Sequence, residues 1–312
     1  MGRRSAVSES LVGVKDSAPG LVKAAGRQLF RTYGMATGDL RPLPDFIIIG
    51  TKRGGTTSLF RYLLQHPAVL PTFPSFQTLK GVYFFDQHFN KGLRWYRSHF
   101  PSGPYRSILG RAKGVRVLTG EASPGYLFHP LAAARIAGSM PQVKVIALLR
   151  NPVDRAYSHY RDEVKRGAET LSFEDALERE PVRLAGELER TVADPTYYSA
   201  ALDRHSYLAR GMYLAQVEAW MRAFPADQLL ILRSEDLYTG PQRVHAAVLE
   251  FLDLPVVRLE GYPRHNGLPE SRMNPATRRQ LAEYFRPHNR RLFERLQRDF
   301  GWDSRRQAMP QW

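Results

Sequence analysis

The chain has 312 residues, and its 43% hydrophobic content is enough to fill the core of one large α/β domain. A formal net charge of +15 indicates an anionic partner or a highly soluble surface. The absence of cysteine excludes disulfides, thiolate metal sites and a cysteine nucleophile. No apolar stretch reaches the roughly 18 to 20 residues of a membrane span, and the amino terminus lacks the apolar core of a secretion signal. We therefore expect a cytoplasmic protein.

Residues 1–44 are predicted to form a basic extension in front of a single domain at 45–312. The segment between Gly20 and Gly38 predicts a short basic amphipathic helix. Two interpretations of this helix stay open. One is peripheral contact with a membrane surface, and the other is packing over the domain, which is the commoner arrangement.

Four short runs without polar alternation are predicted to be strands of a parallel sheet, buried on both faces, at 46–50, 115–120, 143–150 and 228–233. Helical patterns fall at 56–65, 130–138, 153–166, 172–179, 208–223, 240–255 and 274–301. The Pro- and Gly-rich stretch 101–114 is predicted to be an insertion loop. Strands that alternate with helices indicate an α/β protein with a three-layer, doubly wound fold and a mainly parallel sheet.

The stretch GTKRGGTTSL, residues 50–59, directly follows the first predicted strand, where open parallel sheets bind their ligands. Gly54 and Gly55 allow the backbone to approach an anion closely, and the helix that follows directs its first N–H groups at the same place. Thr56, Thr57 and Ser58 add hydroxyl donors. The stretch therefore predicts a site for a phosphate or a similar anion.

The cations of this stretch stand before the glycines. A nucleotide-triphosphate loop requires a lysine directly after the last glycine, together with a metal-binding acid, and Thr56 occupies the lysine position. Lys52 and Arg53 are placed to neutralise an anion without a metal ion. A second anion site is predicted in LLRNPVDRAYSHYRDE, where Arg150 ends a strand and Ser158 falls about two turns into the next helix. Anion sites at neighbouring strand ends indicate a ligand with phosphates at both ends.

Several stretches, in this order, resemble the sulfotransferases that use 3′-phosphoadenosine 5′-phosphosulfate (PAPS), above all the bacterial members and the heparan sulfate branch. They are FIIIGTKRGGTTSLFRYLLQHP, KGVYFFD, GEASPGYL, VIALLRNPVDRAYSHY and GMYLAQVEAWMRAFPADQLLILRSEDL. The resemblance covers about residues 44–255 and extends more loosely to 302. It implies a P-loop-like phosphosulfate loop, PAPS as co-substrate, 3′-phosphoadenosine 5′-phosphate (PAP) as product, and no metal ion.

The resemblance also implies roles for individual residues. The 5′ phosphosulfate is expected in the loop at 50–59, where Arg53 stands in place of the family's lysine and Lys52 comes one residue earlier. The 3′ phosphate is expected against Arg150 and Ser158. Arg264 is a candidate for the basic residue that closes over the donor near the end of the domain.

The catalytic base is where the sequence departs from these relatives. Gly81 occupies the position of the glutamate that heparan sulfate enzymes place before their paired aromatics. We consider Glu121, at a strand end, and His88, with Asp86 beside it, as replacements. Ala122 stands where those enzymes have a lysine that serves an acidic sugar acceptor, which makes a heparan-type polymer a poorer match.

The acceptor group is expected to be a hydroxyl or an amine of a small molecule, a lipid or a glycan. Two other functions remain as alternatives, a P-loop kinase that acts on a small molecule and a protein that binds anionic ligands without catalysis. Nucleic acid is not an expected partner, because the basic residues are scattered and are not interleaved with a ladder of aromatics.

Overall fold

A computed structural model describes residues 20–75, 80–265, 267 and 272–303, and for residues 20–27 it describes the backbone alone. The sheet consists of β1 (Phe46–Gly50), β2 (Val69–Leu70), β3 (Leu118–Ala122), β4 (Lys144–Leu149) and β5 (Leu229–Arg233). All neighbouring strands pair in parallel, in the order β2-β3-β1-β4-β5. Because β3 and β4 lie on opposite sides of β1, the loop after β1 emerges where the strand order reverses, which is the usual ligand position in this architecture.

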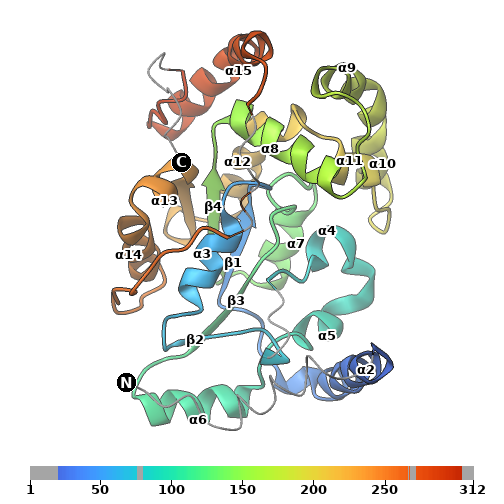
Figure 1. Ribbon diagram of the computed structural model, residues 1–312. Helices are drawn as coiled ribbons and strands as arrows, with labels where there is room; N and C mark the ends of the chain where they lie inside the picture. The colour runs from blue at the N-terminus through green and yellow to red at the C-terminus, as the bar shows by residue number, and fades with distance from the viewer. Residues whose placement is uncertain (1–19, 76–79, 266, 268–271, 304–312) are drawn as a thin grey trace.

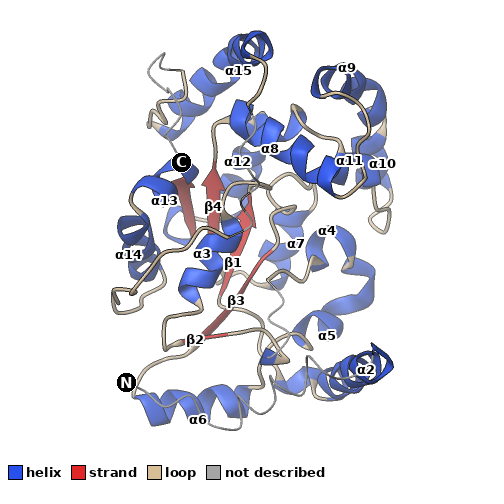
Figure 2. Ribbon diagram, in the orientation of Figure 1, coloured by secondary structure: helices blue, strands red, loops and turns tan. Residues whose placement is uncertain are grey.

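Helices cover both faces of the sheet (Figures 1 and 2). Their bounds are α2 Gly20–Ala36, α3 Thr56–Leu63, α4 Phe84–Gln87, α5 Gly92–Arg97, α6 Gly103–Lys113, α7 Ala132–Ser139, α8 Pro152–Lys165, α9 Phe173–Leu184, α10 Glu187–Ala193, α11 Ala200–Arg204, α12 Tyr213–Ala223, α13 Ser234–Thr239, α14 Pro241–Phe251 and α15 Pro275–Leu296. The three-layer α/β fold predicted from the sequence is confirmed.

The alternation of side chains along β1 divides the core into two halves. Ile47 and Ile49 pack on one face of the sheet, with side chains of α7, α12 and α15, whereas Phe46 and Ile48 pack on the other face with α3 and α14. All four side chains are completely buried. A strand buried on both faces needs no polar alternation, and for this reason the uninterrupted FIII run was recognisable as a central strand.

The prediction of a loop at 101–114 is wrong, because residues Gly103–Lys113 form helix α6. Pro104 and Gly114 mark the helix ends: Pro104 lies in the first turn, where no intrahelical N–H is needed, and Gly114 ends the helix with φ 64°. No side chain of α6 is buried, so the helix lacks the apolar stripe by which sequence reasoning finds helices.

The predicted amphipathic helix between Gly20 and Gly38 is present as α2, which lies beside α5 at the edge of the domain (Figure 1). Hydrogen bonds join the two: Arg31 donates to the Ser98 hydroxyl at 3.1 Å, and Arg94 of α5 donates to the Met35 carbonyl at 3.0 Å. Within the described residues no helix combines the length and apolar character that a bilayer crossing requires.

Candidate active site

The loop after β1 turns tightly at the carboxyl edge of the sheet. Arg53 and Gly55 adopt left-handed conformations with φ of 73° and 87°. A Cβ atom on Gly54 would lie 2.8 Å from the Leu148 carbonyl oxygen of β4, so this close approach requires glycine. Gly55 precedes α3, whose first turn contains Thr56, Thr57 and Ser58 and presents its backbone N–H groups to the loop. The predicted phosphate cradle is thus placed at the switch point of the sheet.

Lys52 is engaged with acidic groups of two helices. Its Nζ lies 3.0 Å from Glu163 Oε1 of α8 and 3.3 Å from Asp203 Oδ1 of α11, and it donates to the Asp203 carbonyl at 2.7 Å. Burial lowers the pKa of Lys52, and the two carboxylates partly offset that effect. The loop is therefore tied through Lys52 to the helices α8 and α11.

Arg53, Arg150 and Ser158 come together on one surface. The Arg53 side chain donates through Nε to Ser158 Oγ at 3.1 Å and forms an ion pair with Asp162 at 3.1 Å. Arg150 at the end of β4 donates to the Arg53 carbonyl at 2.9 Å. Ser158 lies on α8, whose first turn begins with Pro152 as the sequence predicted. The two predicted anion sites are therefore contiguous.

The segment before α15 lies over the first turn of α3. The His265 backbone N–H donates to Ser58 Oγ at 3.0 Å, and the Arg264 guanidinium lies over the Tyr238 ring at 4.8 Å from its centroid. Tyr238 is itself next to the loop, since a Cβ on Gly55 would approach its hydroxyl to 2.8 Å. Arg264 is thus brought close to the loop through Tyr238.

Lys80 is a residue that sequence reasoning missed. Its Nζ donates to Thr56 Oγ1 at 2.8 Å, in the first turn of α3, and so supplies the loop with a cation from outside it. Burial, reinforced by the charge of Arg53, lowers the pKa of Lys80 to about 7. The sequence held an indication of this residue, because Lys80 directly precedes Gly81, where the chain departs from the resembling enzymes.

Glu121 is completely buried and its carboxylate is saturated with donors. It accepts from the Val82 backbone N–H at 2.6 Å and from the hydroxyls of Ser123, Tyr96 and Tyr126 at 2.7, 2.8 and 3.0 Å. Burial raises its pKa, and these four bonds act in the opposite direction. With every strong acceptor position used, the geometry favours a structural role for Glu121 over that of a base.

His88 is not brought to the loop. Its ring packs edge-on against Trp95, with 5.2 Å between centroids, in the aromatic cluster between α4 and α5. Burial and the nearby Lys91 lower the pKa of His88. Asp86 and His88 are two residues apart in the chain but lie in different surroundings, since Asp86 lines a cleft and the His88 ring packs on Trp95. The geometry therefore argues against His88 as the base.

A narrow cleft of about 30 Å³ opens beside Lys52 and Asp203. Its lining includes Asp86 of α4, Gly125, Tyr198, Asp203 and Arg210. This volume is enough for about two water molecules or for the hydroxyl end of a larger molecule. The cleft is therefore suited to admit one reacting group next to the loop.

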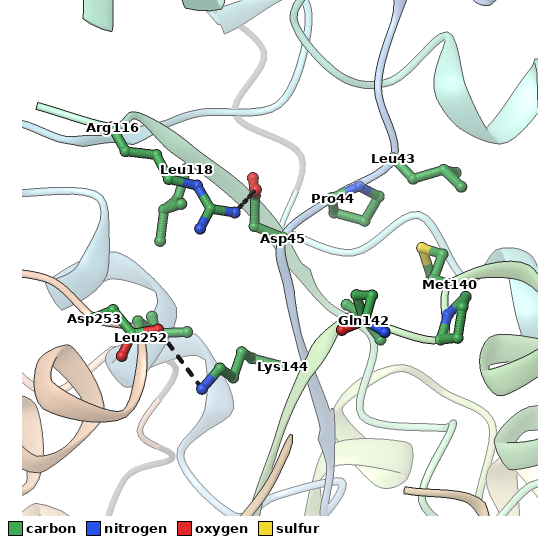
Figure 3. A pocket seen from close by; sticks show the side chains of 12 residues that line it. Leu43, Pro44, Asp45, Arg116, Leu118, Met140, Gln142, Lys144, Leu252 and Asp253 are labelled. Atoms are coloured by element: carbon green, nitrogen blue, oxygen red, sulfur yellow. Dashed lines mark hydrogen bonds and ion pairs between the residues drawn. The ribbon is translucent and has the colours of Figure 1, made fainter. Parts of the chain in front are cut away.

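A larger cavity of about 270 Å³ lies at the other end of the strands (Figure 3). Its charged groups are paired with one another: Arg116 with Asp45 at 3.1 Å and Lys144 with Asp253 at 3.7 Å. Because Asp45 and Lys144 precede or begin β1 and β4, this cavity is separated from the loop by the length of the sheet. Its size alone does not make it the functional site.

Comparison with known proteins identifies the class to which this fold and site belong. The sulfotransferase domain family matches residues 43–309, and the chain belongs to this family. Family membership implies PAPS as co-substrate, which agrees with a loop built for an anion.

The relatives include a heparan sulfate enzyme, a membrane-associated enzyme and a bacterial protein of known structure. The chain is 31% identical to the mouse heparan sulfate glucosamine 3-O-sulfotransferase 3B1, over 84% of this chain and 66% of that protein. It is 26% identical to the membrane-associated sulfotransferase kil1 of Dictyostelium discoideum, over 91% of this chain and 71% of that protein. A sulfotransferase structure from Alicyclobacillus acidocaldarius is 30% identical, with a TM-score of 0.61, and the match covers 84% of this chain and all of the other.

Proposed function

We propose that this protein transfers the sulfuryl group of PAPS to a hydroxyl or amine of its acceptor by in-line displacement, without a metal ion. The observation that carries the proposal is the continuous surface formed by Arg53, Arg150 and Ser158 at the carboxyl ends of β1 and β4. Such a surface offers charge-assisted hydrogen bonds to two anionic groups of one ligand. Gly54 lets the loop pack directly against the Leu148 carbonyl of β4, and the first turn of α3 that follows offers backbone N–H groups to a phosphate or sulfate.

In this proposal the residues divide between the two ends of the donor. Arg53, Gly54, Gly55, Thr56, Thr57 and Ser58 surround the 5′ phosphosulfate, and Lys80 joins them through Thr56. Lys52, which the sequence also assigned to this group, is engaged with Glu163 and Asp203 and ties the loop to α8 and α11. Arg150 and Ser158 hold the 3′ phosphate, and Arg264, which lies over the Tyr238 ring beside the loop, closes over the donor. The donor supplies an activated sulfuryl group with a phosphate as the leaving group. Arg53 and Lys80 hold the charge that spreads over the sulfonate and leaving oxygens as the bond breaks.

The acceptor enters through the cleft beside Asp203. Two acidic side chains, Asp86 and Asp203, line this cleft. The cation Arg210 also lines it, and its guanidinium contacts Asp203, Ser206 and the Leu202 carbonyl. Ala122, where heparan sulfate enzymes place a lysine, is completely buried in the core below the loop. These features favour an uncharged hydroxyl of a small molecule, a lipid or a neutral glycan over an acidic polymer. A cytoplasmic location stays a prediction.

Calorimetric titration with PAP in the presence of a chelator tests the proposal. We expect one site per chain, with PAP bound at least tenfold more tightly than adenosine 5′-phosphate, because the 3′ phosphate adds contacts with Arg150 and Ser158. Transfer from labelled PAPS to a panel of alcohols, phenols and amines then identifies the acceptor class. A protein that ignores PAP but binds ATP with magnesium is instead a kinase, and that result refutes the proposal.

A further inference from the structure

The transfer step requires a group that takes a proton from the acceptor, and the loop cations are unsuited to this task. The residue must be a base in the ionised form, must lie at the cleft, and must have an oxygen or nitrogen that no other protein group occupies. Of the carboxylates near the loop, Glu163 and Asp203 are paired with Lys52, and Asp162 is paired with Arg53. Glu121 accepts four hydrogen bonds. Asp86 is the carboxylate that remains at the cleft.

We propose that Asp86 is the catalytic residue that accepts the proton of the acceptor hydroxyl. This inference rests on the proposed function and assigns the base within it. As the acceptor oxygen forms its bond to sulfur, its O–H bond breaks and the proton passes to the Asp86 carboxylate. The bond between sulfur and the bridging oxygen breaks at the same time, and its electron pair leaves with PAP. Atoms and charges balance without a further reactant.

The position of Asp86 is fixed by its neighbours in α4. Phe84 and Phe85, directly before it, are completely buried. Their backbone N–H groups donate to the Tyr126 hydroxyl at 2.8 and 3.4 Å, and Tyr126 in turn donates to Glu121. Glu121 therefore acts as a positioning residue: through Tyr126 it holds the short helix that presents Asp86 to the cleft.

The carboxylate of Asp86 is buried but not satisfied. Its Oδ1 is buried and has no hydrogen-bond partner among the described residues. Its Oδ2 faces Gly125, where a Cβ atom would come within 2.3 Å of it. A buried unsatisfied polar atom normally costs about 1 to 3 kcal/mol, so its retention here is explained if the oxygen receives a substrate group.

The surroundings of Asp86 set its proton affinity in a useful range. Burial, followed by the charges of Asp203 and Glu121, raises its pKa to about 8. Although burial acts in the same direction on Asp203, Lys52 and Arg210 lower its pKa overall. Neighbouring acids whose pKa values are pushed apart are typical of acid–base sites. The other titratable or charged groups that act on or respond to Asp86 are Arg210, Arg135, Tyr83, Tyr126 and Tyr198.

The test uses the full chain with Asp86→Asn, which keeps the shape of the side chain but cannot accept the proton. PAP affinity, measured by calorimetry, should stay within about twofold, since Asp86 contacts none of the loop residues. Transfer from PAPS is then measured with water alone and with phenols of increasing acidity. We expect a loss of about 100-fold or more with water and weakly acidic phenols, and a loss below about tenfold with 4-nitrophenol, which ionises without help.

Two further readouts separate proton transfer from a structural effect. The wild-type rate should rise with pH through about 8, because Asp86 must be ionised, whereas the Asp86→Asn rate should not. In the free protein, the infrared difference between wild type and Asp86→Asn should contain a carboxyl band that titrates in the same range. Asp203→Asn serves as the matched control in the same cleft, and its loss should be the same for all phenols.

Gly125→Ala provides a second variant, which retains the Asp86 carboxylate but forces it to shift. It should lower the rate without changing PAP affinity. An Asp86→Asn loss that is equal for all acceptors, or a pH profile that the substitution leaves unchanged, overturns the inference while the proposed function stands. If the wild type neither binds PAP nor releases sulfate from PAPS, the proposed function fails, and the inference fails with it.

Discussion

The loop at 50–59 and the cleft lined by Asp86 and Asp203 are adjacent, yet they carry opposite kinds of charge. Around the loop the side chains are donors: Arg53, Arg150 and Lys80 with the hydroxyls of α3 and Ser158. Around the cleft the charged groups are mainly carboxylates, and Asp86 is not matched by a cation at hydrogen-bonding distance. This difference supports the proposed division of the reaction, in which the loop stabilises a developing negative charge and the cleft receives a departing proton.

The largest expected effect concerns Arg53 on the loop side. Arg53→Ala removes a preorganised cation at the leaving group and should lower the transfer rate about 100- to 1,000-fold, or roughly 3 to 4 kcal/mol of barrier. Arg53→Lys is the matched control and should recover most of the rate. Initial rates with labelled PAPS measure both. If Arg53→Ala changes only PAP affinity, Arg53 serves in binding and not in the transfer step.

Arg150→Ala tests which end of the donor is bound by Arg150. It should weaken PAP about 10- to 100-fold, the equivalent of one charge-assisted contact of roughly 1.5 to 3 kcal/mol, and should leave adenosine 5′-phosphate nearly unaffected. Parallel calorimetric titrations with the two nucleotides give the ratio. Equal losses for both would discredit Arg150 as the contact of the 3′ phosphate.

Glu121→Gln distinguishes support from chemistry on the cleft side. The amide places an NH₂ group where a donor now binds, so it should destabilise the fold by about 1 to 3 kcal/mol in chemical denaturation. The rate per folded molecule should fall less than for Asp86→Asn, because Asp86 itself is retained. A rate loss as large as that of Asp86→Asn, with unchanged stability, would restore Glu121 as the base.

The smallest effect is the pH dependence of PAP binding. Lys80, with a pKa of about 7, is charged below that pH and neutral above it. Because only the charged form attracts the anion, PAP affinity should fall as the pH rises through 7, by at most about tenfold per pH unit. Titrations between about pH 6.5 and 8.5 measure the slope, and Lys80→Met should flatten it. A slope that survives this substitution belongs to another group.

The sequence predicted the loop side far better than the cleft side. Gly54, Gly55 and the hydroxyls of α3 are consecutive, so their arrangement follows from one strand and one helix. Arg150 and Ser158 were found because parallel strands end at one edge of the sheet. The cleft instead combines α4, the segment around Gly125 and residues 198–210, which are distant in sequence. Its composition depends on tertiary packing, and a single sequence does not reveal which distant segments meet.

The sequence also did not reveal how deeply each acidic side chain is buried or which donors surround it. Glu121 and Asp86 are both acids near the strand ends, but the structure gives the first four donors and leaves Oδ1 of the second without one. The helix α6 was missed for a related reason: its side chains are not buried, so its only sequence signals were the proline and glycine at its ends. Proline and glycine are common both in loops and at the ends of helices, so they do not distinguish the two.

The backbone at Gly81 limits how this enzyme can evolve. A Cβ atom there would lie 2.5 Å from the Ala122 carbonyl oxygen and 2.8 Å from Ser123 Oγ. Replacement of Gly81 by glutamate in one step thus collides with β3 before its carboxylate reaches any substrate. A chain with this path therefore needs a compensating shift in the neighbouring strand before position 81 can carry a glutamate.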